Sequence, residues 1–135
     1  DPKMTRFSIT MDEALDFILE ATKDGKGGEI FVPEMSAFSI EDLKNAMFEL
    51  LGDSGEEVIG LRAGEKMHEN IITGDEMQYA WKLGKNFVIF HPNITKNEIK
   101  ERYPNIQKIE KFGSYSSEHA KKISHNELKE MISIF

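Results

Sequence analysis

The sequence has 135 residues, of which 39% are hydrophobic and 30% charged, a composition typical of a soluble globular protein with one domain's core, residues 1–135. Acidic residues outnumber basic ones by 24 to 17, and the net charge is −7. A nucleic-acid partner is not expected, because binding to phosphate backbones needs clustered lysine and arginine. There is no cysteine, which excludes disulfides and thiolate sites and suits a cytoplasmic protein. No apolar run is long enough to cross a membrane.

Five helix starts are predicted by a serine or threonine that is followed three residues later by an acidic residue, the pattern of a capping box. Apolar residues recur at helical spacing behind the first two starts, which predicts amphipathic helices with core-facing apolar sides, ending near Gly25 and Gly52. The third and fourth helices are expected to be short. The five starts are Thr10–Glu13, Ser39–Asp42, Thr73–Glu76, Thr95–Glu98 and Ser124–Glu127, and the first apolar stripe is Ala14, Leu15, Ile18, Leu19 and Ala21.

Strands are predicted between these helices, over residues 7–9, 29–32, 58–61 and 87–90. Each is a short apolar run, and most are bounded by turn-forming or charged residues. The alternation of strands and helices predicts an α/β fold. Residues 104–123 are expected to be irregular.

The chain begins with Asp1-Pro2-Lys3 ahead of Met4 and runs almost at once into a predicted strand. Natural domains usually begin with a looser segment. We therefore expect the chain to be part of a longer polypeptide.

The histidines and glycines do not predict a metal or phosphate site. His68-Glu69 begins like a zinc-protease helix, but Ile72 stands where the second histidine is required. The other three histidines are far apart in the sequence. The glycine-rich residues 25–28 follow a predicted helix rather than a strand, so we interpret them as a helix end.

The segment Gly60–Glu69 is the strongest candidate for a binding site. The predicted strand brings Arg62, a glycine turn and Glu65 to a strand end, where ligands bind in open α/β sheets. Arg62 can hold a diphosphate through two parallel hydrogen bonds, and Glu65 can accept hydrogen bonds from a ribose or sugar diol. From spacing alone, a polar surface turn is the more common explanation.

Four motifs in order carry a resemblance to a known family. They are Asp1-Pro2-Lys3-Met4-Thr5-Arg6-Phe7, Gly28-Glu29-Ile30-Phe31-Val32-Pro33, Arg62-Ala63-Gly64-Glu65-Lys66-Met67-His68-Glu69 and Tyr115-Ser116-Ser117. The series resembles the carboxy-terminal part of the inverting UDP-N-acetylglucosamine 4,6-dehydratases, extended short-chain dehydrogenases/reductases of the polysaccharide-biosynthesis group. The resemblance covers nearly the whole chain.

This resemblance implies the α/β substrate-binding portion of such an enzyme, without the Rossmann half that holds NADP and the Tyr-x-x-x-Lys catalytic pair. The parent would be a lyase that acts on a UDP-N-acetylhexosamine for surface-glycan synthesis. The chain alone would hold no cofactor, no metal and no catalytic residue, and we expect it to be inactive. Two alternatives stay open: a fragment of a UDP-N-acetylhexosamine 4-epimerase, and a stand-alone binding or assembly module without catalysis.

The resemblance assigns the UDP diphosphate to Arg6 and Arg62, and the ribose to Glu65. The sequence departs from the family where Ala63 replaces the usual proline and where Glu34 replaces the usual lysine. The asparagine that often follows the Tyr-Ser-Ser match is also missing. Surfaces that normally pack on the cofactor half would be exposed, and the strand at residues 7–9 would be an unpaired edge, so we expect a homo-oligomer.

Overall fold

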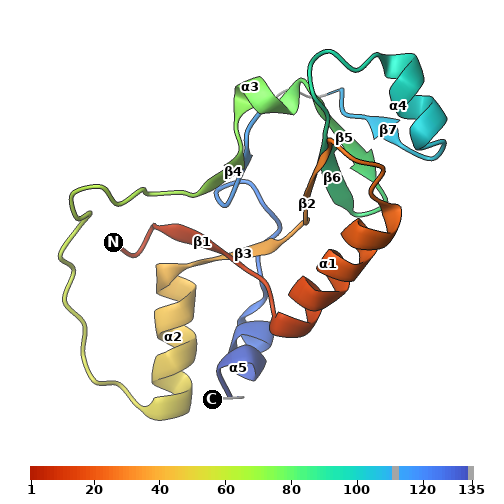
Figure 1. The fold of residues 1–135 in the computed structure, drawn as a ribbon. Helices are drawn as coiled ribbons and strands as arrows, with labels where there is room; N and C mark the ends of the chain where they lie inside the picture. The colour runs from red at the N-terminus through yellow and green to blue at the C-terminus, as the bar shows by residue number, and fades with distance from the viewer. Residues whose placement is uncertain (111–112, 134–135) are drawn as a thin grey trace. The chain divides into compact units, whose positions relative to one another are not determined.

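The computed structural model describes residues 1–110 and 113–133, and it confirms the α/β class (Figure 1). The described helices are α1 (Met11–Asp24), α2 (Ile40–Leu51), α3 (Gly74–Met77), α4 (Lys96–Arg102) and α5 (His125–Ser133). The described strands are β1 (Thr5–Ser8), β2 (Ile30–Val32), β3 (Ser36–Ser39), β4 (Asn70–Ile72), β5 (Ala80–Leu83), β6 (Asn86–Ile89), β7 (Gln107–Lys108) and β8 (Tyr115–Ser116). Residues 111 and 112, within the segment predicted to be irregular, lie outside the described residues.

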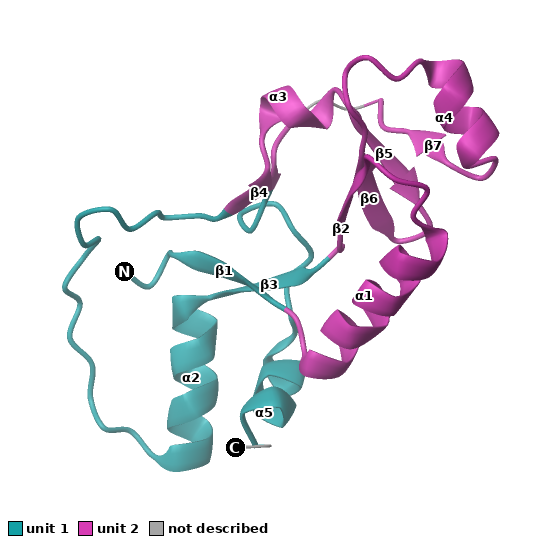
Figure 2. Ribbon diagram, viewed as in Figure 1, with its two compact units in different colours: residues 1–8, 35–69, 116–135 teal, residues 9–34, 70–115 magenta. Residues whose placement is uncertain are grey.

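The chain divides into two compact units, each assembled from segments that are distant in the sequence (Figure 2). Unit 1 consists of Asp1–Ser8, Met35–Glu69 and the carboxy-terminal stretch from Ser116. Unit 2 consists of Ile9–Glu34 and Asn70–Tyr115.

All five predicted helix starts are confirmed by hydrogen bonds at the caps. Thr10, Thr73 and Thr95 each accept a bond from the backbone N–H three residues later, and the glutamate at that position accepts the reciprocal bond. The Ser124–Glu127 pair does the same, at 3.3 and 2.8 Å. At Ser39 the acid is an aspartate, which accepts from the serine hydroxyl at 2.6 Å rather than from the backbone. Its shorter side chain accounts for the incomplete box.

Unit 1 joins a two-stranded antiparallel sheet to two helices. β1 pairs with β3 in the register Thr5 opposite Ser39, so the predicted strand at residues 7–9 is shifted and is not left unpaired. β3 leads directly into α2, and α2 packs against α5. Glu49 on α2 lies 3.0 Å from His125 and 2.9 Å from Lys129 on α5. These ion pairs join the two helices of unit 1.

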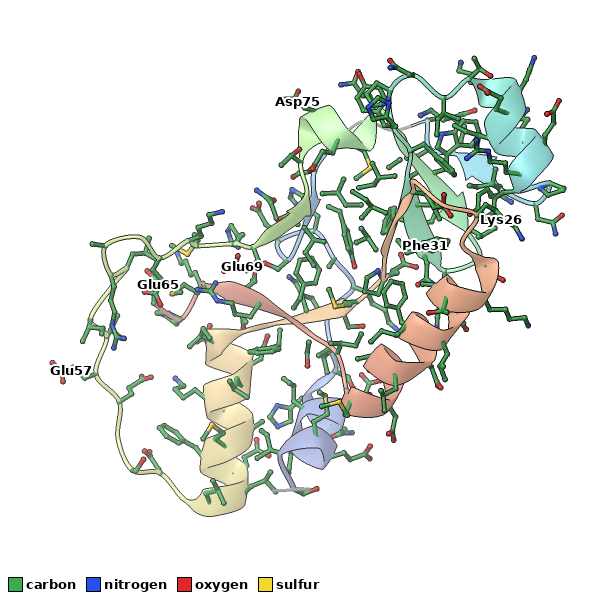
Figure 3. All side chains as sticks on the ribbon, in the orientation of Figure 1. Lys26, Phe31, Glu57, Glu65, Glu69 and Asp75 are labelled. Carbon is green, nitrogen blue, oxygen red and sulfur yellow. The ribbon has the colours of Figure 1, made fainter. Side chains whose placement is uncertain are left out.

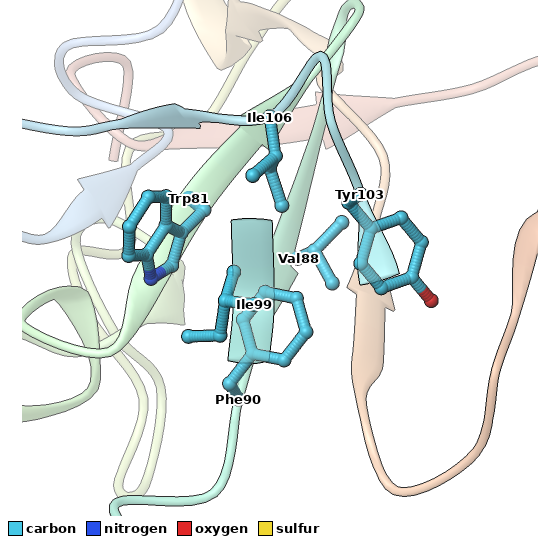
Figure 4. Packing of buried hydrophobic residues seen from close by; sticks show 6 residues of the cluster. All are labelled: Trp81, Val88, Phe90, Ile99, Tyr103 and Ile106. Carbon is cyan, nitrogen blue, oxygen red and sulfur yellow. The ribbon is translucent and has the colours of Figure 1, made fainter. Parts of the chain in front are cut away.

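Unit 2 is built on a four-stranded antiparallel sheet in the order β2-β6-β5-β7. The predicted strands at residues 29–32 and 87–90 are β2 and β6. The core cluster brings side chains of β5 and β6 together with those of α4 and the turn after it (Figure 4). Its buried members are Trp81, Val88, Phe90, Ile99, Tyr103 and Ile106. Unit 2 therefore has a buried hydrophobic core. All the strand pairs of its four-stranded sheet are antiparallel.

The predicted strand at residues 58–61 does not form. Residues 52–69 contain no helix or strand, and Val58, Ile59 and Leu61 are 63%, 59% and 47% exposed. None of the described strands pairs with this segment. A strand is stable only when a neighbour takes its backbone hydrogen bonds, so apolar β-branched residues alone do not produce one. The backbone also enters the left-handed region at Gly60, where φ is 71°.

The apolar stripe of α1 is not core-facing, contrary to the prediction. No residue of α1 is buried, and Leu15, Ile18 and Leu19 are 51%, 57% and 68% exposed. Helical periodicity identifies which side of a helix is apolar, but it does not say whether another element covers that side.

Because several large apolar side chains of α1 are exposed, we expect the isolated chain to self-associate as its concentration rises. Leu19→Lys should reduce the association measured by light scattering. Asp16→Asn is the matched control, because it changes the charge of the same helix by one unit and removes no apolar surface. A wild-type chain that stays monomeric at concentrations used for crystallisation would contradict this expectation.

Candidate functional site

Arg62 and Glu65 form a closed turn within the long loop at residues 52–69. The Glu65 N–H donates to the Arg62 carbonyl at 3.0 Å, and the Glu65 carboxylate accepts from the Arg62 N–H at 3.0 Å. Gly64 has φ 83°, the left-handed value that a type II turn needs at its third residue. Both side chains are exposed. The turn is therefore as predicted, but it does not stand at a strand end, because the strand before it is absent.

Arg6 lies on β1 and is held by the same loop a few residues further on. Its Nη1 donates to the carbonyl of Thr5 at 2.8 Å and to that of Met67 at 3.3 Å. Its Nε lies 3.7 Å from the Glu69 carboxylate, and its side chain is 24% exposed. The Met67 carbonyl also accepts the N–H of Thr5 at 3.0 Å. Arg6 is thus ordered against the loop rather than free in solvent.

A buried polar network connects β1, the end of this loop and the Tyr-Ser-Ser motif. Ser117 is fully buried and Thr5 is 6% exposed. Their hydroxyl oxygens lie 2.7 Å apart, and the Ser117 hydroxyl also donates to the Thr5 carbonyl at 3.1 Å. The Ser117 Oγ accepts the Glu69 N–H at 2.9 Å, and the Ser117 N–H donates to the Glu69 carbonyl at 2.8 Å. Three of the four motifs found in the sequence therefore meet in unit 1.

His68 joins this network through its Nδ1, which lies 2.8 Å from the Thr5 hydroxyl oxygen. The Nε2 of His68 lies 3.9 Å from the Glu118 carboxylate. This network orders the imidazole on one side and leaves its second nitrogen next to an acidic side chain.

The sequence prediction named Arg6, Arg62 and Glu65, and all three lie in unit 1. Among the described residues no hydrogen bond or ion pair joins Arg6 to Arg62 or to Glu65; the connection runs through Met67 and the following residues. Figure 3 labels Glu65 and Glu69, which lie on the same loop before and after Met67 in the sequence. The prediction missed four polar residues of the network. They lie within the quoted motifs, and what marks them is their hydrogen bonds to one another, which only the structure shows: Thr5, His68, Glu69 and Ser117.

Other classes of site find no support in the part of the chain that the structure describes. No group of three or more His, Cys, Asp or Glu residues there is arranged to hold a metal ion. None of the helices described is sufficiently long and apolar to cross a bilayer.

Comparison with known proteins places this fold and this set of motifs in a family. Residues 1–91 match the family described as polysaccharide biosynthesis protein. The X-ray structure of Pen from Bacillus thuringiensis superposes with a TM-score of 0.76 and 34% sequence identity, over 99% of this chain and 38% of that one. By fold the chain is thus an α/β protein, and its sequence matches this family over more than half of its length. It belongs to the polysaccharide biosynthesis protein family.

Two similar proteins carry the names of different reactions. A UDP-glucose 4-epimerase from Rickettsia felis is 32% identical over 98% of this chain and 39% of its own length. A UDP-N-acetylglucosamine 4,6-dehydratase (inverting) from Campylobacter jejuni is 32% identical over 88% of this chain and 36% of its own length. The chain therefore spans about two fifths of the length of the curated relatives it matches.

Proposed function

We propose that this chain is the UDP-sugar-binding part of a longer nucleotide-sugar 4,6-dehydratase of the C5-inverting type, a cytoplasmic lyase of surface-glycan synthesis. The observation that carries the proposal is the joining of the β1 arginine, the Arg62–Glu65 turn and the Ser117 network in one compact unit. Two guanidinium groups beside one loop provide the planar donors that suit diphosphate oxygens. The relatives named after UDP-sugars support the same ligand class.

Each side chain has a stated part in this proposal. Arg62 is exposed and makes the two-pronged contact with the diphosphate, while Arg6 adds a second cationic contact. The Glu65 carboxylate already accepts the Arg62 N–H through Oε2. A carboxylate accepts several hydrogen bonds, so Glu65 has the capacity left to bind ribose hydroxyls.

NADP would be held by polypeptide outside residues 1–135. The fit of this chain to a dinucleotide is poor, because the glycines at residues 25–28 lead from α1 into β2. A dinucleotide turn leads from a strand into a helix. No catalytic step is therefore assigned to these residues, and the substrate proposed for the whole protein is a UDP-N-acetylhexosamine.

A UDP-sugar 4-epimerase is the second candidate. The epimerase relative matches 98% of this chain, against 88% for the dehydratase. The intact mass of the native protein tests the premise, since both candidates require a polypeptide much longer than this chain. Product analysis of the full-length protein then separates the two, because a dehydratase yields a 4-keto-6-deoxy sugar nucleotide and an epimerase yields the C4 epimer.

Substitutions at the turn test the binding site itself. In the full-length protein, Arg62→Ala should weaken UDP binding about tenfold or more, since a charged hydrogen bond contributes roughly 1.5–3 kcal/mol. Arg62→Lys should lose less affinity, because it keeps the charge but not the planar fork. Glu65→Gln should cost least, since the amide oxygen still accepts one hydrogen bond. Calorimetric titration with UDP measures the affinity of the wild type and of the three variants.

Stability is the control for this series. Arg62 is exposed and its side chain is not part of a core, so its substitution should leave the thermal unfolding midpoint nearly unchanged. Equal UDP affinities across the series would mean that the residues form only a surface turn.

A further inference from the structure

Ser117 is the centre of the network that lies behind Arg6. Its side chain has no exposed surface, and its hydroxyl group takes part in three hydrogen bonds. Through its hydroxyl and its own N–H it binds both the N–H and the carbonyl of Glu69. Ser117 therefore fixes the backbone of Glu69 on both sides and the backbone of Thr5 at its carbonyl.

Thr5 and Glu69 are also the residues that hold the guanidinium group of Arg6. The Thr5 carbonyl accepts from Ser117 at 3.1 Å and from Nη1 of Arg6 at 2.8 Å, which uses both of its lone pairs. The Glu69 carboxylate lies beside Nε at 3.7 Å. Any shift of either backbone moves the groups against which Arg6 is oriented.

The donors of Arg6 are divided by these contacts. A guanidinium group carries five N–H donors. Two on Nη1 go to the carbonyls of Thr5 and Met67, and the one on Nε faces Glu69. The two donors on Nη2 are the ones that these contacts do not use. A side chain held in this way loses less rotamer freedom when it binds a ligand than a free arginine does.

We propose that Ser117 is a positioning residue for Arg6: through Thr5 and Glu69 it holds the guanidinium group so that its Nη2 donors meet the phosphate oxygens of the ligand. The inference rests on the proposed function and adds to it a residue 111 positions away in sequence from the arginine it controls. Ser117 does not touch the ligand in this arrangement. Its effect on binding is therefore transmitted entirely by Arg6.

A double-mutant cycle in the full-length protein tests this transmission, with UDP as the probe. The proteins are wild type, Arg6→Ala, Ser117→Ala and the double variant. Arg6→Ala should weaken UDP binding about tenfold. Ser117→Ala should weaken it several-fold in the wild-type background, and by less than about twofold when Arg6 is already alanine, because coupled residues are not additive.

Glu69→Gln provides a second variant that should keep the fold, because its side chain is 42% exposed and its backbone bonds to Ser117 remain. It should also weaken UDP binding only when Arg6 is present. Thermal unfolding of each protein measures its stability. If Ser117 had a purely structural role, affinity would change in parallel with stability in both backgrounds. The loss of stability in Ser117→Ala should be similar in both backgrounds, while the loss of affinity should not.

The outcomes separate this inference from the proposed function. If Arg6→Ala leaves UDP affinity unchanged, the assignment of Arg6 to the diphosphate fails and the inference fails with it. If Arg6→Ala weakens binding but Ser117→Ala weakens it equally in both backgrounds, or not at all, the binding site stands and the positioning role is overturned. Loss of affinity that appears only with Arg6 present supports the proposal.

Discussion

Trp81→Ala is expected to lower the free energy of unfolding of unit 2 by about 3–5 kcal/mol, the range for removing a buried aromatic side chain. Trp81 is 2% exposed and belongs to the cluster that joins the sheet to α4. Lys108 also places its ammonium group 5.1 Å from the centre of the indole ring. Alanine would leave a cavity that β5 and β6, paired along their length, cannot easily close.

Circular dichroism during urea denaturation measures this effect; fluorescence cannot, because Trp81 is the only tryptophan in the chain. Leu19→Ala is the control in the same unit, since Leu19 is 68% exposed and should change stability by less than about 0.5 kcal/mol. If the two variants unfolded at the same urea concentration, Trp81 would not be part of a packed core.

Tyr103→Phe should destabilise unit 2 by about 1.5–3 kcal/mol, the contribution of one hydrogen bond to a charged group. The Tyr103 hydroxyl donates to the Glu29 carboxylate at 2.6 Å and accepts from the Lys26 N–H at 3.1 Å. The other oxygen of Glu29 is buried and has no hydrogen-bond partner among the described residues. Removing the hydroxyl therefore takes a donor from a carboxylate that already lacks one.

The same pair predicts an alkaline limit to the stability of unit 2. Burial, together with the hydrogen bond to Glu29, raises the pKa of Tyr103 to about 12, compared with about 10 in an unfolded chain. Because the pKa of Tyr103 is higher in the folded state, the protonated tyrosine stabilises unit 2. This stabilisation is complete below about pH 10 and is lost as the pH rises through about 12. The free energy of unfolding of the wild type should fall between about pH 10 and pH 12. In Tyr103→Phe the part of that fall that comes from Tyr103 should be absent.

At acidic pH the pair has the opposite effect, because the pKa of Glu29 is lowered rather than raised. Burial alone would raise the pKa of Glu29, but hydrogen bonds from Tyr103 and from the N–H groups of Lys26 and Gly27 outweigh it and lower the pKa overall. The stabilisation by Glu29 is therefore lost as the pH falls through its lowered pKa. Tyr79→Phe is the matched control for both limits, because none of the hydrogen bonds between described side chains uses the Tyr79 hydroxyl. A Tyr103→Phe variant with the pH profile of wild type would contradict the account.

The helix starts could be predicted from the sequence because a cap is a local structure. Thr10 and Glu13 are three residues apart, and their reciprocal bonds form whether or not anything packs on the helix. The turn at Arg62–Glu65 was predictable for the same reason, since Gly64 supplies the left-handed conformation that it needs. The motif order was also sufficient to predict the family to which the chain belongs.

Pairing and burial could not be read in this way, because they depend on residues far away in the sequence. Val58–Leu61 has the composition of a strand but finds no partner among the described strands, and the apolar side of α1 is exposed although its periodicity is regular. The buried network shows the same dependence. Ser117 became a candidate only when the fold brought its hydroxyl to Thr5 and Glu69. The sequence by itself thus determined the local caps, the turn and the family, because each rests on neighbouring residues or on motif order. Only the tertiary structure decided which strands pair, which apolar sides are covered and which polar groups hold Arg6, because these depend on contacts between segments separated by many residues.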